Sequence, residues 1–155
     1  MVIITHFSRG LKNMKYLEML KSTGLKATPQ RICVLKALSG HTHPSIDELY
    51  AQIKKEHPSI SLATVYKNLS ALVDENLVVE ISMPNQKARY DIYEEEHIHV
   101  VCKHCGAVYD MFSKDAKMHE YQHHLENKIG ASLNRLNIVA TTNNCKNCST
   151  VSATA

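Results

Sequence analysis

Residues 91–110 combine two kinds of potential metal ligand within twenty positions, in the sequence DIYEEEHIHVVCKHCGAVYD. Carboxylates and imidazoles come from Asp91, His97, His99 and Asp110, and thiolates come from Cys102 and Cys105. Oxygen and imidazole donors suit an exchangeable divalent ion, whereas paired thiolates suit closed, structural zinc. The segment therefore predicts two metal sites, one that senses and one that holds the fold.

The thiolates have a second pair further along the chain. Cys145 and Cys148 repeat the Cys-x-x-Cys spacing forty residues after Cys105, and of the five cysteines only Cys33 is single. In a cytoplasmic chain this spacing indicates zinc before disulfides. Four thiolates would form a tetrahedral Zn²⁺ site that attaches the C-terminal tail to a sheet. A thioredoxin-like redox pair, the competing interpretation, needs a βαβ context that neither pair has.

The two histidines lie in HIHVVC, which reads as a strand, so His97 and His99 point to the same side. One metal could take both, and with Asp91 and Asp110 the set would hold Fe²⁺, Mn²⁺ or Zn²⁺. Polar residues that merely line a sheet are the alternative. A strand with Asp110, a helix that begins at Ser113 and ends at Gly130, and a third strand over 133–140 follow.

A second possible metal motif lies on that helix. His119 and His123 belong to HEYQH, which matches the H-E-x-x-H signature of zinc metallopeptidases. Such sites need a third protein ligand, commonly supplied downstream, and the chain has no Asp, Glu or His after Glu126. The spacing thus favours a non-enzymatic protein over a peptidase.

The N-terminal part predicts an arm over 1–13 followed by four helices. Their boundaries come from caps and stops: Met14 to Gly24, Pro29 to Gly40 after the cap Thr28, a helix after Ser45 with Glu48 as its capping box, and one after Ser61. Cys33 lies on the second helix, where a small core residue is favoured over a redox thiol because no second Cys or basic partner is near in sequence.

The third and fourth helices resemble a helix-turn-helix followed by a hairpin wing over 77–83 and 88–93. The face of the fourth helix that lies opposite its apolar stripe is polar and carries no acid. The candidate DNA-binding residues are Thr64, Tyr66, Lys67 and Asn68 on this helix and Lys87 and Arg89 on the wing. A plain helical bundle with a solvated face is the alternative.

Charge is uneven along the chain, although the net charge is only +3. Residues 1–84 carry ten Lys/Arg against seven Asp/Glu, and residues 85–155 carry eight of each. The basic excess of the first half is consistent with nucleic-acid binding without establishing it. No apolar run is long enough for a membrane span, and we expect a cytoplasmic protein with no membrane partner.

Over residues 14–148 the chain resembles the ferric uptake regulator family. The resemblance rests on ATPQR at 27–31, HP at 43–44, SLATVYKNL at 61–69, RYD at 89–91, HIHVVCKHCG at 97–106 and the last Cys-x-x-Cys pair. It implies an α+β protein with a winged helix-turn-helix domain over 14–93. It also implies a metal-binding α/β dimerisation domain over 94–155, with a three-stranded sheet and one long helix.

The resemblance further implies a homodimeric, metal-dependent repressor that binds double-stranded operator DNA. Carried over by position, the family's sensing site falls on His43, Asp91, His97, His99 and Asp110. His43 comes from the resemblance alone, because its spacing to the other ligands carries no signal. It would link the DNA-binding domain to the sheet domain through one Fe²⁺ or Mn²⁺ ion.

Within the family the chain looks most like the peroxide-responsive repressors. Positions 91 and 110 are Asp, where iron regulators usually have Glu. A second ligand set of iron regulators is missing, because its positions hold Glu96, Ile98, Lys117 and Asn134. Hydrogen peroxide would then oxidise a ligand histidine, His43 or His97, and relieve repression of peroxide-defence genes. An iron- or zinc-uptake regulator is the alternative; Lys67 stands where iron regulators often carry Arg, so operator preference does not transfer.

Overall fold

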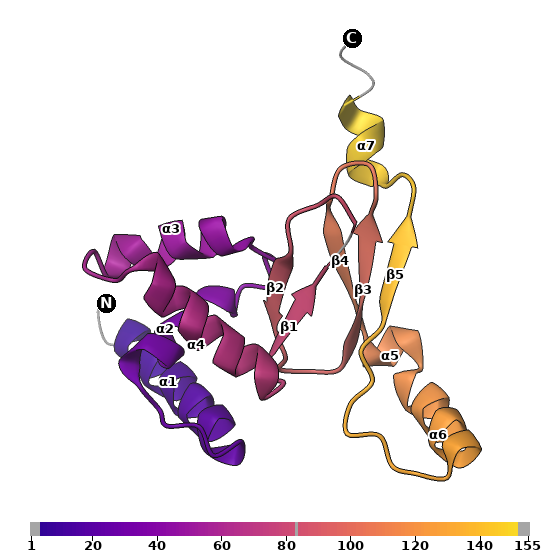
Figure 1. Cartoon of the computed structure of the whole chain (residues 1–155), viewed down its shortest axis with the longest axis horizontal. Helices are drawn as coiled ribbons and strands as arrows, with labels where there is room; N and C mark the ends of the chain where they lie inside the picture. Colours follow the sequence, from indigo (N-terminus) through magenta and orange to yellow (C-terminus); the bar gives the residue numbers. More distant parts are fainter. Residues whose placement is uncertain (1–3, 83, 152–155) are drawn as a thin grey trace. The chain divides into compact units, whose positions relative to one another are not determined.

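The computed structural model describes residues 4–82 and 84–151, which form two compact units with a boundary between Tyr93 and Glu94 (Figure 1). The first unit is helical with a small wing, and the second contains a three-stranded sheet. The predicted α+β class is thereby confirmed. No helix within the described residues is long and apolar enough to cross a membrane.

Four helices and a two-stranded wing form the first unit. They are α1 (Ile4–Ser22), α2 (Pro29–Leu38), α3 (Ile46–Glu56), α4 (Leu62–Asp74), β1 (Val78–Ile81) and β2 (Arg89–Ile92). The side chains of Thr28, Ser45 and Ser61 each accept a hydrogen bond from the first turn of the next helix. These side chains satisfy backbone N–H groups that the helix itself leaves unpaired, which is why the helices begin there.

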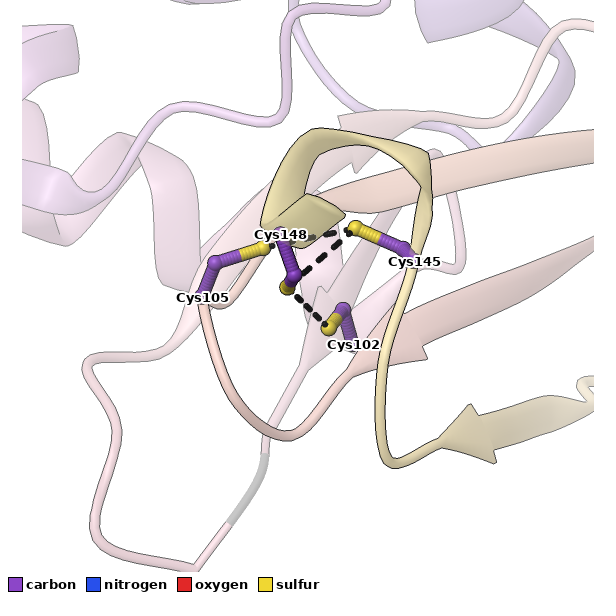
Figure 2. A group of neighbouring side chains, drawn as sticks. All are labelled: Cys102, Cys105, Cys145 and Cys148. Atoms are coloured by element: carbon purple, nitrogen blue, oxygen red, sulfur yellow. Dashed lines mark hydrogen bonds between the residues drawn. The ribbon is translucent and has the colours of Figure 1, made fainter. Parts of the chain in front are cut away.

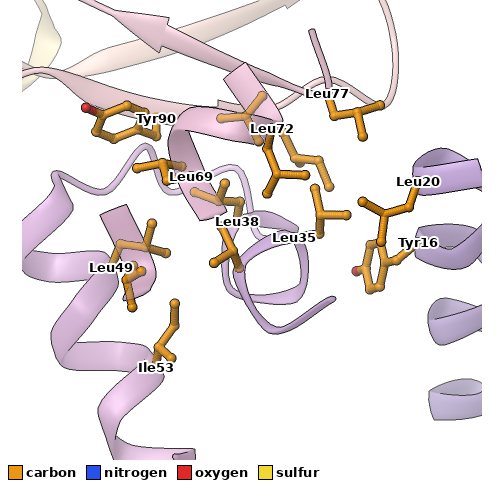
Figure 3. Packing of buried hydrophobic residues seen from close by; sticks show 14 residues of the cluster. Tyr16, Leu20, Leu35, Leu38, Leu49, Ile53, Leu69, Leu72, Leu77 and Tyr90 are labelled. Atoms are coloured by element: carbon orange, nitrogen blue, oxygen red, sulfur yellow. The ribbon is translucent and has the colours of Figure 1, made fainter. Parts of the chain in front are cut away.

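The core of this unit lies where the apolar faces of the helices meet the wing (Figure 3). Leu35, Leu38, Leu49, Leu69 and Leu72 are completely or almost completely buried. Leu49 belongs to α3, and Leu69 and Leu72 lie three residues apart on one face of α4. Burial of a leucine side chain contributes about 1.5–3 kcal/mol, so this shared core fixes how α3 and α4 cross.

The strand β2 connects the wing to the loop before α3. It pairs antiparallel with β1, with Asp91 opposite Val79. On its other side Arg89 forms a β-bridge with Ser45, and the Tyr90 N–H donates to the Pro44 carbonyl at 3.0 Å. This backbone pairing brings Asp91, which is fully buried, next to the loop before α3.

The second unit consists of a sheet and helices at its edges. Its elements are β3 (His97–Cys102), β4 (Val108–Phe112), α5 (Ser113–Ala116), α6 (Met118–Ile129), β5 (Val139–Thr142) and α7 (Lys146–Val151). The strand order is β4-β3-β5, with β4 antiparallel and β5 parallel to β3. The register sets His99 directly opposite Asp110, so both side chains lie on one face of the sheet.

Three sequence predictions need correction. The expected arm over 1–13 is wrong for residues 4–13, because α1 begins at Ile4; residues 1–3 lie outside the described residues. The helix from Ser113 to Gly130 is broken at Lys117, which adopts a left-handed φ of 46°. The third strand begins at Val139 rather than at 133. Val139 pairs with His99, only two residues after the start of β3, so most of residues 133–138 have no residue of β3 opposite them.

Candidate metal centres

Four cysteines converge at one end of the sheet (Figure 2). Cys102 ends β3, Cys105 follows in a tight knuckle, and Cys145 and Cys148 lie at the start of α7. Gly106 closes the knuckle with a φ of 72°, and its N–H donates to the Cys102 carbonyl at 2.8 Å. Glycine suits this position because a side chain rarely tolerates that φ.

The sulfur positions fit a tetrahedral ion. The Sγ atoms of Cys102 and Cys148 are 3.5 Å apart, those of Cys105 and Cys145 are 3.5 Å apart, and those of Cys145 and Cys148 are 3.7 Å apart. Four sulfurs at about 2.3 Å from one Zn²⁺ would be about 3.8 Å from one another. The donor set is therefore chemically and geometrically suited to structural zinc.

A tyrosine outside the cysteine group acts on one of the thiols. The polar Tyr109 side chain beside Cys145 lowers the pKa of this thiol to about 6, and the same proximity raises the pKa of Tyr109 to about 12. A thiol with this pKa is mostly thiolate at neutral pH, which is the form that binds metal. Tyr109 was not anticipated from the sequence, where nothing links it to a cysteine 36 positions away.

The second unit also holds three donors on the sheet face opposite Ile98. His97 Nε2 and His99 Nε2 are 3.0 Å apart, and they lie 3.9 and 3.8 Å from an Asp110 carboxylate oxygen. His97 Nδ1 lies 2.7 Å from the Glu95 carbonyl oxygen, which can only accept, so Nδ1 carries the proton and Nε2 presents its lone pair. That is the usual tautomer of a metal-binding histidine.

These distances fit a shared ion. Two donors each about 2.1 Å from one metal are about 3.0 Å apart when they are cis in an octahedron and at most about 4.2 Å apart when they are trans. All three separations lie within this range. The nitrogen and oxygen chemistry suits Fe²⁺, Mn²⁺ or Zn²⁺.

The first unit contributes a separate group of donors. His43 Nε2 is 4.0 Å from Asp91 Oδ2, and both residues are buried. A third residue, His41, is closer still, with its Nδ1 3.1 and 3.3 Å from the two carboxylate oxygens of Asp91. Sequence reasoning missed His41. The available signal was the spacing of two residues between His41 and His43. This spacing places two side chains on the same side only in a strand, and these residues lie in a loop.

The wing residues proposed for DNA contact have partners within the protein. Arg89 donates to the His43 carbonyl at 2.8 Å and lies 3.4 Å from Glu48 Oε2, so it joins the His43 loop to the start of α3. Lys87 forms an exposed ion pair with Asp47 at 2.6 Å. An exposed pair is weak and exchangeable, so Lys87 stays available to a phosphate, whereas Arg89 has an internal role.

On the polar face of α4, some side chains form hydrogen bonds within the helix and its cap, and others are exposed. The Thr64 hydroxyl is 2.8 Å from the Ser61 hydroxyl, and the Asn68 amide donates to the Thr64 carbonyl at 2.8 Å. Tyr66 is half exposed and Lys67 is exposed. Leu62 at the start of the same helix, which its helical spacing predicts on the apolar face, is instead exposed.

Two other sequence features do not form sites within the described residues. His119 and His123 are exposed and pair with Glu96 and Glu126, and neither belongs to a convergent group of metal donors. Burial is the largest cause of a raised pKa for the Cys33 thiol, which fits the core interpretation of this residue.

The fold and its donor groups define a winged-helix protein with a metal-binding sheet domain. The chain belongs to the ferric uptake regulator family, whose model matches residues 22–141.

Two kinds of relative bear on its function. The crystal structure of the Campylobacter jejuni peroxide stress regulator is similar at 64% identity and a TM-score of 0.75, covering 85% of this chain and 98% of that one. The Pseudomonas aeruginosa ferric uptake regulator with manganese is similar at 26% identity and a TM-score of 0.68, covering 84% of this chain and 98% of that one.

Among curated proteins, the peroxide-responsive repressor PerR of Staphylococcus aureus (strain Mu50) is 38% identical over 92 residues. The alignment covers 59% of this chain and 62% of that repressor, so it spans less than two thirds of the relative.

Proposed function

We propose that this protein is a cytoplasmic, homodimeric, metal-dependent transcriptional repressor that senses hydrogen peroxide and is not an enzyme. The observation that carries the proposal is the composition of the donor groups: nitrogen and oxygen donors surround Asp91 in the first unit and Asp110 in the second, and neither of these groups contains a thiolate. Fe²⁺ in a nitrogen and oxygen site can react with peroxide while zinc in a thiolate site cannot change its oxidation state. The likeness to a peroxide stress regulator supports the same function.

Structural zinc would be held by Cys102, Cys105, Cys145 and Cys148. This role is supported by the small core of the second unit. Among the described residues of this unit, the buried apolar side chains are Val101, Met118 and two of these cysteines, Cys102 and Cys148. A domain of this size commonly needs a metal or a partner to be stable. Zinc would join the β3–β4 knuckle to α7.

The regulatory ion, Fe²⁺ or Mn²⁺, would be held by His43, Asp91, His97, His99 and Asp110. The first two belong to one unit and the other three to the next, and only residues 93–96 lie between β2 and β3. An ion that binds all five would favour one arrangement of the two units over all others. Metal binding would thus select the arrangement that is competent to bind DNA.

Arg89 would carry this effect to the helix-turn-helix. Its guanidinium contacts both the carbonyl of a proposed ligand, His43, and the carboxylate of Glu48. Glu48 accepts from the Ser45 N–H at 2.7 Å at the start of α3. A metal-induced shift of the His43 loop therefore has a direct path to the first helix of the helix-turn-helix.

Double-stranded operator DNA and a second copy of the chain would be the partners. Tyr66 and Lys67 present an exposed, acid-free face of α4 that suits a major groove. In the second unit Met111, Phe112, Tyr121, Ile129 and Val139 are large exposed hydrophobic residues. Apolar surface of this kind is typical of a protein interface, and a homodimer would cover it.

Bound Fe²⁺ supplies the electron-transfer chemistry that activates hydrogen peroxide next to the ligands. The net change at the protein is the insertion of one peroxide oxygen at an imidazole carbon of His43 or His97, with water as the other product. An oxidised imidazole is a poorer donor, so the site loses its metal and repression ends. Mn²⁺ would support DNA binding without this reaction.

A titration of operator binding tests the proposal. Zinc-loaded protein is saturated with Fe²⁺ or with Mn²⁺, treated with peroxide under otherwise equal conditions, and then digested for mass spectrometry. We expect peroxide to release only the iron form from DNA, with one added oxygen on the peptide that contains His43 or His97. Iron-loaded protein that stays on DNA with unmodified histidines would instead favour the iron- or zinc-uptake regulator, the second candidate.

A further inference from the structure

The loop before α3 holds two histidines in a conformation that side chains rarely adopt. His41 and His43 both have a φ of 48°. A left-handed conformation is strained for any residue other than glycine, and such residues persist where other interactions outweigh the strain. For His43 the proposed metal offers that compensation, whereas His41 is outside the family's ligand positions and needs another.

His41 makes its contact with the carboxylate of Asp91. Its Nδ1 is 3.1 Å from Oδ1 and 3.3 Å from Oδ2, both within hydrogen-bond range. An ionised carboxylate only accepts hydrogen bonds, so Nδ1 must carry the proton and donate. While Nδ1 donates this hydrogen bond it has no lone pair for a metal, which leaves Nε2 as the only ring nitrogen of His41 that could bind one.

His43 has a different relation to the same carboxylate. Its Nε2 is 4.0 Å from Oδ2, too far for a hydrogen bond but within the roughly 4.2 Å that two donors on one ion can span. The His43 side chain is 7% exposed and that of His41 is 27% exposed. His43 therefore lies where a ligand would lie, and His41 lies further toward solvent beside Asp91.

We propose that His41 is a positioning residue of the regulatory site, which orients the Asp91 carboxylate through its Nδ1–H and does not itself bind the metal. This inference rests on the proposed regulatory site. Hydrogen bonds to ligand carboxylates hold them at the angle that the metal needs, and their loss typically weakens metal binding about 10–100-fold. The contact also ties the left-handed loop to β2, so that His43 and Asp91 are presented together.

Three variants of the full-length, zinc-loaded protein separate this role from others. His41→Gly removes the donor and relieves the left-handed backbone, so any loss cannot come from added strain. His41→Asn keeps an N–H donor at the place of Nδ1 and tolerates the left-handed conformation. His43→Gly removes a proposed ligand from the same loop and serves as the reference for ligand loss.

The measurements are Mn²⁺ affinity by titration, zinc content, thermal unfolding without Mn²⁺, and the number of histidine nitrogens coupled to bound Mn²⁺ by pulsed electron paramagnetic resonance. We expect His41→Gly to weaken Mn²⁺ binding about 10–100-fold. His41→Asn should restore most of the affinity with an unchanged nitrogen count. His43→Gly should lose saturable binding, and zinc content should be the same in all three variants.

Each other result overturns the inference. Wild-type affinity in His41→Gly would remove the positioning role, and a nitrogen count lowered by one in His41→Asn would make His41 a ligand. A loss of Mn²⁺ affinity in His41→Gly that His41→Asn did not restore at all would make the role of His41 structural. If the wild-type protein itself bound no Mn²⁺, the proposed function would fail first and this inference with it, which distinguishes the two failures.

Discussion

Arg89 is the residue whose role differs most between sequence and structure. A basic residue on a wing suggests a phosphate contact, but its guanidinium donates to the His43 carbonyl and lies beside Glu48. Arginine suits such a junction because its planar group presents several donors in fixed directions. The neighbouring Lys87, whose ion pair with Asp47 is exposed, is the better candidate for DNA.

This difference predicts opposite effects for two neighbouring variants. Arg89→Leu should weaken Mn²⁺ binding at least about tenfold, because the loop that carries His43 is no longer anchored. Lys87→Leu should leave Mn²⁺ affinity unchanged but lower the slope of log K against log salt for operator binding by about 0.9 for each phosphate that is no longer neutralised. Isothermal titration with Mn²⁺ and operator binding at several salt concentrations measure the two effects.

The reverse pattern would favour the phosphate role that the sequence predicts for Arg89. If Arg89→Leu kept its Mn²⁺ affinity while the salt slope of operator binding fell, Arg89 would bind a phosphate.

At the scale of elements, local signals predicted helix starts well because caps act within one turn. Thr28, Ser45 and Ser61 each accept the bond that their position predicts. Predictions that depend on distant pairing were less accurate. The start of β5 is set by its register with β3, and the left-handed break at Lys117 is signalled neither by glycine nor by proline.

The metal donors divide in the same way. His97 and His99 are two apart on a strand, and the cysteines repeat a short spacing, so both groups were predictable from local pattern. His43 required a family resemblance, and His41 was missed. Both lie in a loop whose position next to Asp91 depends on the Ser45–Arg89 bridge across more than forty residues.

The capping box of α3 gives a pH-dependent prediction. The Ser45 backbone N–H, which donates to Glu48, lowers the Glu48 pKa below its usual value of 4.5. A carboxyl with a lower pKa in the folded state stabilises the protein above the unfolded pKa, and this contribution is lost as pH falls through the folded value. The free energy of unfolding should therefore decrease as the pH is lowered through about 4.5 and beyond, and part of this decrease should come from Glu48.

Glu48→Gln isolates this contribution. Glutamine can keep the capping hydrogen bonds but does not titrate, so the variant should lose about 0.3–1 kcal/mol at neutral pH and converge with wild type as pH falls below 4.5. Denaturant unfolding between pH 3 and pH 7, roughly the range of carboxyl titration, measures the difference. Asp47→Asn makes the same charge change one residue earlier without a capping bond. A difference between Glu48→Gln and wild type that stays constant with pH would contradict the assignment.

At the scale of the whole molecule, the two units divide the work unequally. The first has an extensive apolar core of its own, whereas the second has few buried apolar side chains and a group of four convergent thiols. A fold stabilised by zinc can keep its other donors for an exchangeable ion. The proposed regulatory ion would then not be needed to hold either unit together, only to restrain one with respect to the other.

The connection between the units offers a direct test of that restraint. Glu94, Glu95 and Glu96 follow the boundary, and a Glu-specific protease can report on their accessibility. Mn²⁺ at 100 times its Kd should suppress metal-free, open arrangements about 100-fold, or about 2.7 kcal/mol, and slow cleavage there accordingly. Cleavage after Glu75, at the end of α4, should keep its rate.

Asp110→Ala should retain zinc and the fold, lose metal-dependent operator binding and be cleaved at the same rate with or without Mn²⁺. If wild-type protein bound Mn²⁺ tightly and its connection were still cleaved at the metal-free rate, a single ion would not join the two groups of donors.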